Sequence, residues 1–242
     1  MIGYNVKRAN ELMESIAQAY KDLGIYTKEQ WDGVLYILQG QWIGEDEQDF
    51  EKRLADRICT LYLNASELAN NSIETIAGLA QAWHDFQQKN TITGETVVGD
   101  AQFKLDKPKI DKVDDIVKPN IKTIANDANR GLQTETSKQT IQDKITEFVN
   151  AIKAKTTGLF ETIQTNSAFF GDQTTAIKSY VDKVGAAIGE VTVAVKDMFD
   201  ALDNLAATSY TTATSDITQQ FTQANTNVEN SLNDLGNTRW SA

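Results

Sequence analysis

The stretch QWIGEDEQDF, residues 41–50, decides the fold of this 242-residue chain, because a helical pattern ends just before it and a longer one starts just after it. Gly40 is suited to close the incoming helix in a left-handed conformation, and Gly44 is a permissive N-cap for the outgoing helix. So short a connection makes successive helices antiparallel neighbours. We therefore predict a helical hairpin with Trp42 packed into its bend and Phe50 opening the apolar seam of its second helix.

Before the bend, apolar residues recur at steps of three and four, which is typical of one face of an amphipathic helix. Gly24 interrupts the pattern, and Thr27 with Gln30 matches a capping box for a fresh helix. We therefore predict two helices, or one broken helix, in this arm. Its apolar positions are Val6, Ala9, Met13, Ile16, Tyr20, Leu23, Trp31, Val34, Leu35 and Leu38.

After the bend, apolar positions alternate steps of four and three, the rhythm of a coiled-coil seam. The seam slips at residues 70–72, which leaves open one helix with a stutter or a second helix that starts there. A continuous helix over 45–90 would be on the order of 70 Å long. The positions before the slip are Phe50, Leu54, Ile58, Leu61, Ala65 and Leu68, and those after it include Ile73, Ile76, Trp83 and Phe86.

The middle of the chain has a different pattern. Residues 96–98 and 101–105 read as two short strands joined by Gly99 and Asp100, so a small β-hairpin near 95–105 is one interpretation and an ordered loop is the other. Helical spacing returns at Ile110, Val113, Val117, Ile121 and Ile124, which predicts a helix in which Pro119 marks a kink or a first turn.

The carboxyl-terminal half is the most regular part. Residues 177–205 hold nine successive seam positions, which predicts a long helix. Apolar residues over 141–163 predict another helix before it, with Phe169, Phe170, Gly171 and Asp172 in the turn between the two. A last helix is expected over 217–235, where most other positions are Thr, Gln, Asn and Ser.

These narrow apolar stripes predict an all-α protein, an elongated helical hairpin plus a long-helix, coiled-coil-like bundle. We divide the chain into a hairpin over residues 1–90, a hairpin-like linker over 91–109 and a bundle over 110–242. A chain of 242 residues is long enough to bury a core without disulfides or metal. Its only two prolines leave the long stretches on either side of the middle region free to form helices.

Composition excludes several partners. The formal net charge of −11 argues against a nucleic-acid surface, which needs a basic face to release counterions. The most apolar run, residues 184–195, is too short for a membrane span and contains Glu190, so we expect no span and no membrane contact. Cys59 is the only cysteine and is expected to be a small buried hydrophobe. The amino terminus has no apolar run of the length that a secretory signal needs.

The sequence holds no recognisable catalytic constellation. His84 is the only histidine, and we interpret it as a structural or surface residue. No Glu-x-x-His pair of a bundle di-iron site, calcium loop, phosphate loop or nucleophile elbow is present. We therefore expect a non-enzymatic protein with no catalytic, cofactor-binding or metal-binding residues and no cofactor.

The first part of the chain resembles the WXG family of small helical hairpins exported by type VII secretion. The resemblance rests on a helix, the residues Trp42-Ile43-Gly44 and a second helix with Phe50 six residues after the glycine. The resemblance covers residues 1–90. It implies that Trp42, Gly44 and Phe50 form the bend, that the protein is secreted or secretion-associated without a signal peptide, and that it binds a protein partner or itself along its helical seams. Leu38-Gln39-Gly40 is also similar to the Leu-x-Gly mark of helical export domains on polymorphic toxins. Residues 83–87 do not match the Tyr-x-x-x-Asp/Glu signal of the family.

Other interpretations stay open. Trp42 could simply fill a helix–turn–helix corner. Long helices rich in Thr, Gln and Asn also suit a virion or appendage structural protein that self-assembles. A third class is a helical pore-forming toxin component with residues 91–107 as its tongue, although this segment is polar for membrane insertion. The location expected for the protein is accordingly outside the cell by a signal-peptide-independent route, or in a virion.

Overall fold

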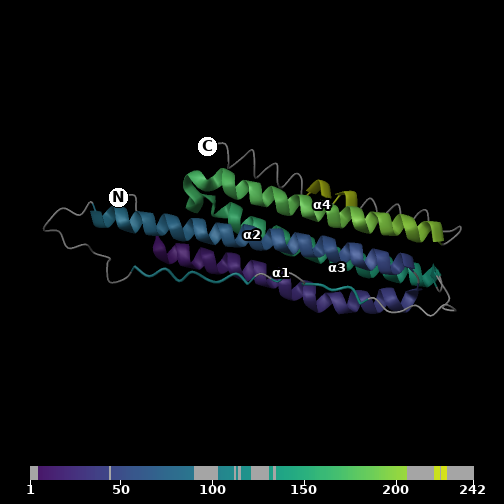
Figure 1. Ribbon diagram of the computed structural model, residues 1–242. Helices are drawn as coiled ribbons and strands as arrows, with labels where there is room; N and C mark the ends of the chain where they lie inside the picture. Colours follow the sequence, from purple (N-terminus) through teal and green to yellow (C-terminus); the bar gives the residue numbers. More distant parts are fainter. Residues whose placement is uncertain are drawn as a thin grey trace.

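A computed structural model describes residues 5–43, 45–89, 103–111, 113, 116–120, 131–132, 135–205, 221–223 and 225–227. The chain is all-α, as predicted. Its elements are α1 (Val6–Gln41), β1 (Trp42–Ile43), α2 (Glu45–Lys89), β2 (Gly131–Leu132), α3 (Glu135–Thr165), the 3-10 helix η2 (Ser167–Gln173) and α4 (Thr174–Leu205). Figure 1 shows that the four long helices lie side by side in an elongated bundle.

The four helices form two hairpins that point in opposite directions. In the first hairpin, α1 and α2 meet at β1, and in the second, α3 and α4 meet at η2. The guanidinium of Arg8, near the start of α1, lies 5.9 Å from the ring centroid of Phe169 in η2. The start of α3 lies instead near the first bend, because Trp42 pairs with Leu132. Each bend therefore sits at the open end of the other hairpin.

Helices of different hairpins make the most extensive contacts, α1 with α3 and α2 with α4. Trp31 of α1 packs on Phe148 of α3, with ring centroids 6.1 Å apart. On the other side, Arg57 of α2 and Glu190 of α4 form an exposed ion pair at 3.6 Å. The two apolar faces are thus buried mainly against each other.

A single hydrophobic cluster runs through both hairpins. It contains residues of all four long helices together with Val117 and Phe221. The predicted division into units of 1–90 and 110–242 stays a prediction about independent folding, but the two share this core. Its largest fully buried apolar side chains are Trp42, Phe50, Phe148, Phe170, Phe199, Met13, Ile16, Leu23, Leu38, Leu54 and Ile58.

The predicted break in the first arm is wrong, because α1 is one helix of 36 residues. Gly24 lies inside it and is buried against α2, where a Cβ would stand 2.8 Å from Cζ and 2.9 Å from Cε2 of Tyr62. Thr27 is buried rather than a cap, and its hydroxyl donates to the Leu23 carbonyl at 2.7 Å. Gly24 therefore serves close helix packing. Gly40 is also helical, and α1 ends only at the extended Trp42.

Helix α2 is continuous over its 45 residues, which selects the single-helix alternative. The slip in its apolar pattern is accommodated without a break: Ser72 is fully buried, and Asn71 donates to the Glu67 carbonyl at 2.7 Å. In the second hairpin, α3 and α4 match the predicted helices, and Gly171 makes the turn between them with a φ of 53°. Residues 221–223 and 225–227 are helical, and the rest of the predicted last helix lies outside the described residues.

The helix predicted over 110–124 is wrong for the described part of that segment. Residues 110, 111, 113 and 116–120 have no helix, and residues 121–124 lie outside the described residues. Pro108 and Pro119 explain the difference, because proline lacks an N–H and favours an extended residue before it. The predicted β-hairpin lies mostly outside the described residues, and its last part, 103–105, has no strand.

Lys153 gives the stability of the fold a pH dependence. It is 6% exposed, its ammonium lies 5.7 Å from the Phe221 ring centroid, and it has no hydrogen-bond partner among the described residues. Burial lowers the pKa of Lys153 from 10.5 to about 8. The unfolded chain then binds more protons between these two values, so the free energy of unfolding should rise as the pH increases from about 8 to 10.

Lys153→Met should remove that slope, because methionine keeps the apolar length of the side chain and loses the titrating amine. We expect the variant to be more stable at pH 7 by on the order of 1–2 kcal/mol. Urea unfolding at several pH values checks both effects. The exposed Lys155→Met is the matched control, and an equal slope in Lys153→Met and the native protein would contradict the assignment.

Candidate interaction site

The predicted bend residues Trp42 and Phe50 come together inside the core. Each is 1% exposed, and their rings are stacked with centroids 6.2 Å apart and planes 27° apart. The backbone N–H of Trp42, the residue that caps the end of α1, donates to the Leu38 carbonyl. Gly44 lies outside the described residues. Trp42 therefore fixes the corner of the hairpin from within and does not present its ring to a partner at the surface.

The bend also contacts the start of the second hairpin. Trp42 and Ile43 pair antiparallel with Leu132 and Gly131 in a two-stranded sheet of two residues each. The Ser137 hydroxyl lies 2.6 Å from Oε1 of Gln41, to which it donates. This junction places the first turns of α3 beside the last turn of α1, so the bend helps to set the register between the hairpins.

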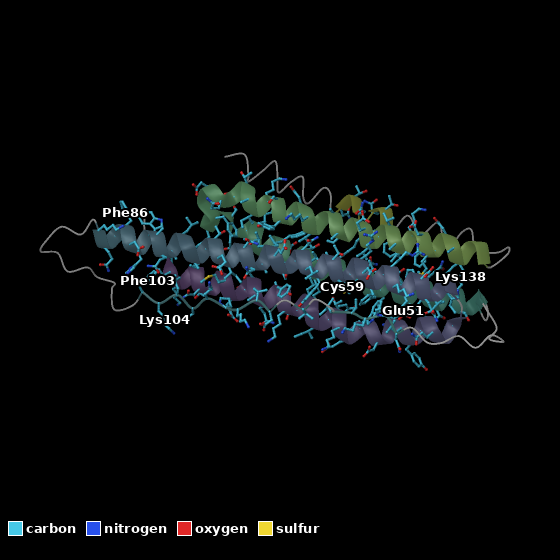
Figure 2. All side chains as sticks on the ribbon, viewed as in Figure 1. Glu51, Cys59, Phe86, Phe103, Lys104 and Lys138 are labelled. Atoms are coloured by element: carbon cyan, nitrogen blue, oxygen red, sulfur yellow. The ribbon has the colours of Figure 1, made fainter. Side chains whose placement is uncertain are left out.

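An extended segment, made up of residues 103–111, 113 and 116–120, bridges α1 and α2. It runs from the open end of the first hairpin to its bend. Figure 2 shows Phe103 and Lys104 near one end of the molecule, with Cys59 and then Glu51 toward the other. At its start, the Phe103 ring stacks on His84 with centroids 3.9 Å apart and planes 8° apart. His84 thus packs on the extended segment.

Helix side chains hold this segment by its main chain. Asn10 donates to the Lys104 carbonyl at 2.8 Å, and Tyr20 donates to the Asp111 carbonyl at 3.2 Å. Farther along, the Trp31 indole N–H donates to the Lys118 carbonyl at 2.8 Å. An extended backbone outside a sheet or helix has carbonyl groups without main-chain hydrogen-bond partners. The side chains of α1 supply partners for three of these carbonyls. These polar contacts of the groove between α1 and α2 are made to main-chain atoms, while the side chains of Ile116 and Val117 are buried in the core.

The segment ends in a polar cluster near the bend. Glu51 is fully buried, and its carboxylate accepts from the backbone N–H of Asn120 and, at 3.1 Å, from the Gln39 amide. Gln39 also donates to the Asn120 carbonyl at 2.8 Å. Cys59 is half-buried and lies 3.5 Å from the Val117 carbonyl. The cluster satisfies the Glu51 charge and fixes the end of the extended segment.

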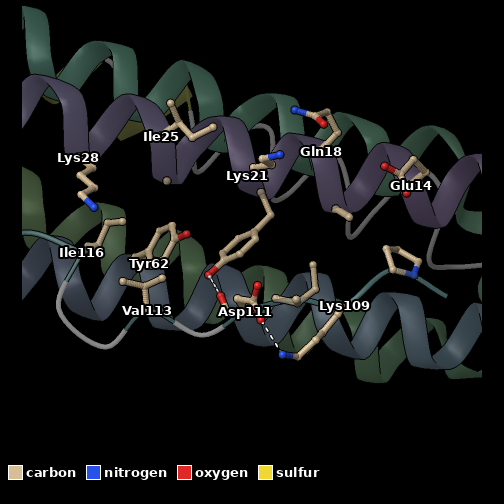
Figure 3. Close-up of a pocket in the computed structure, with 15 residues that line it drawn as sticks. Glu14, Gln18, Lys21, Ile25, Lys28, Tyr62, Lys109, Asp111, Val113 and Ile116 are labelled. Carbon is tan, nitrogen blue, oxygen red and sulfur yellow. Dashed lines mark hydrogen bonds and ion pairs between the residues drawn. The ribbon is translucent and has the colours of Figure 1, made fainter.

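A cavity of about 450 Å³ lies between α1, α2 and the extended segment (Figure 3). On its wall, Tyr20 and Tyr62 are stacked with centroids 4.8 Å apart. Burial raises the pKa of both phenols above 10, so both are neutral near neutral pH. The lining residues are Glu14, Ala17, Gln18, Tyr20, Lys21, Gly24, Ile25, Lys28, Tyr62, Pro108, Lys109, Ile110, Asp111, Val113 and Ile116.

The sequence does not single out the groove residues, because Asn10, Tyr20, Trp31 and Gln39 look like ordinary positions on a helix. The only signal that points to the groove is the pair of Lys-Pro dipeptides at 107–108 and 118–119, which favour extended backbone. No group of three or more metal-ligand side chains is present among the residues that the structure describes. In the same residues, no helix is both long and apolar enough to span a membrane.

Comparisons of the chain with protein-family models, with curated proteins and with solved structures find no match. The architecture and the contacts described above are therefore the basis for assigning a function.

Proposed function

We propose that this chain is a non-enzymatic helical interaction protein, a WXG-like secreted or secretion-associated factor that acts through helix–helix packing. The observation that carries the proposal is the pairing of two oppositely directed hairpins along their apolar faces, with Trp42 stacked on Phe50 at the bend of the first. The resemblance of residues 41–50 to the WXG family implies the same kind of pairing between two hairpin proteins.

The resemblance implies a second hairpin protein as the partner. In this chain, the second hairpin of the same molecule occupies that position. Helices α3 and α4 cover the apolar faces of α1 and α2, so the seams that would drive dimerisation are already buried. The protein should then be a monomer of 26.8 kDa, with further partners meeting its polar outer faces.

Export is the direct test of the proposal. The tagged full chain is expressed in a bacterium with a type VII secretion system and in the same strain without its secretion ATPase. We expect the protein in the culture medium of the first strain only, with a cytosolic marker retained in both. Equal amounts in the two media, or intracellular protein alone in both, would contradict the proposal.

The mass in solution separates this proposal from that of a virion or appendage structural protein. Light scattering at tens of micromolar protein should give the monomer mass, because both apolar faces are covered within one chain. Large assemblies that grow with protein concentration would instead support a virion or appendage structural protein. They would contradict the proposal that the protein acts as a monomer with its two hairpins paired within one chain.

A further inference from the structure

The cavity between α1, α2 and the extended segment has the size and lining of a small-molecule site. Its volume of about 450 Å³ lies within the range of about 300–1,000 Å³ that is typical of such sites. Two of the large apolar side chains that the structure leaves exposed belong to it, Ile25 at 44% and Val113 at 38%. Ile116 is buried behind them. An apolar group in the cavity would therefore remove apolar surface from water.

The charges around this cavity are unevenly paired. Lys109 forms an ion pair with Asp111 at 2.9 Å, so its charge is already compensated. Lys21 and Lys28 line the same cavity, and neither has an ion-pair partner among the described residues. Figure 3 shows the Lys28 side chain extending from α1 toward Ile116. Glu14 also lines the cavity and has no ion-pair partner among the described residues, but Figure 3 shows it at the end of the cavity away from Lys28. The lining thus has two uncompensated ammonium groups and one uncompensated carboxylate, an excess of one positive charge.

The spacing of the two lysines suits one anion. Seven residues along a helix correspond to two turns and about 10 Å of rise, so both lysines lie on the same face of α1. A change of rotamer in these flexible, exposed side chains would let both reach one anion between them. Gly24 lies between them and adds no side chain to the wall. The neutral Tyr20 and Tyr62 phenols add no negative charge near neutral pH. With a formal net charge of −11, the chain as a whole repels anions, so capture depends on Lys21 and Lys28.

We propose that this cavity binds a small amphipathic monocarboxylate. The carboxylate lies between the ammonium groups of Lys21 and Lys28, and the apolar body covers Ile25, Val113 and Ile116. This arrangement selects against a neutral molecule of the same length, which cannot pair with the lysines, and more strongly against an amine, which they repel. Binding at this site needs no export, so it stands or falls separately from the proposed function.

The test is a titration of the full-length, isotope-labelled protein with octanoate, followed through its backbone amide resonances. We expect saturable shifts centred on Gly24, Ile25 and Val113. Octanol should bind at least about tenfold more weakly, and octylamine should give no saturable shift at these residues. The double variant Lys21→Gln and Lys28→Gln should weaken octanoate binding about tenfold or more. Lys155→Gln, which removes an exposed lysine of α3 outside the cavity, is the matched control and should bind as the native protein does.

Several results would overturn the proposal. Octanol binding as tight as that of octanoate would show that the lysines play no part, and so would an unchanged affinity in the folded double variant. The absence of saturable shifts up to about 10 mM octanoate would show that there is no site of useful affinity. Because Lys21 and Lys28 are surface residues on α1, the amide spectrum of the double variant should confirm that the variant is folded.

Discussion

Trp42→Ala should lower the free energy of unfolding by about 3–5 kcal/mol, the largest effect that we expect from a single change in this chain. The Trp42 side chain is 1% exposed and stacks on Phe50, so its removal leaves a large cavity at the corner of the first hairpin. The main chain of the same residue pairs with Leu132, so a collapse of the corner around the missing ring also shifts the junction with α3. Urea unfolding followed by circular dichroism measures the change.

Tyr36→Ala is the control, because Tyr36 is an aromatic residue near the end of α1 but is 78% exposed, and its truncation should change stability by less than about 0.5 kcal/mol. Amide exchange adds a second readout. With one hydrophobic cluster through both hairpins, Trp42→Ala should reduce protection in all four long helices. If residues 135–205 kept full protection while 6–89 lost it, the two predicted units would be separate in stability and the shared core would not act as one.

The helices themselves can be predicted from the sequence wherever a long seam runs without interruption. The nine seam positions over residues 177–205 place α4 correctly, because a period near 3.5 over so many turns has no competing interpretation. Trp42 caps the end of α1 in the structure, although Gly40, the residue predicted to close that helix, lies inside it. What the sequence cannot supply is the pairing of the hairpins, because each seam describes one face and not the face that covers it.

The extended segment escapes sequence-based prediction for a physical reason. Ile110, Val113 and Val117 follow helical steps, but in the structure none of them is helical. Val117 is buried in the core and Ile110 packs against it, whereas Val113 is exposed. The groove that holds the segment is built from side chains far apart in the sequence, such as Asn10 and Trp31, which bond main-chain carbonyls. These hydrogen bonds place no demand on the side chains of the segment, so they leave no pattern in its sequence.

The cavity cannot be predicted from the sequence for the same reason. It lies where Gly24 of α1, Tyr62 of α2 and the residues around Val113 meet, and each of these has an ordinary local explanation. Gly24 in particular looks like the end of a helix, because glycine inside a helix is unfavourable by about 1 kcal/mol relative to alanine. Only the position of the Tyr62 ring reveals that a residue without a side chain is needed there.

Gly24→Ala should therefore destabilise the protein by about 1–3 kcal/mol, although alanine is the better helix former. The new Cβ would stand 2.8 Å from Cζ and 2.9 Å from Cε2 of Tyr62, closer than packed carbon atoms approach. The Tyr62 ring has little room to yield, because it is stacked on Tyr20 at 4.8 Å. Relief then requires α1 and α2 to separate, which costs contacts along the first hairpin. Urea unfolding gives the change in stability.

Gly78→Ala is the matched control, because Gly78 is also inside a long helix and no described atom outside its own helical turn lies within 4 Å of where the alanine methyl would stand. There the helix propensity acts alone, and we expect a gain of about 0.5–1 kcal/mol. Tyr62→Leu removes the ring that the new methyl would meet, so the double variant should be less destabilised than the two single changes added together. A stabilising Gly24→Ala, or strictly additive changes in the double variant, would mean that α1 and α2 do not approach as closely at Gly24 as the Tyr62 ring requires.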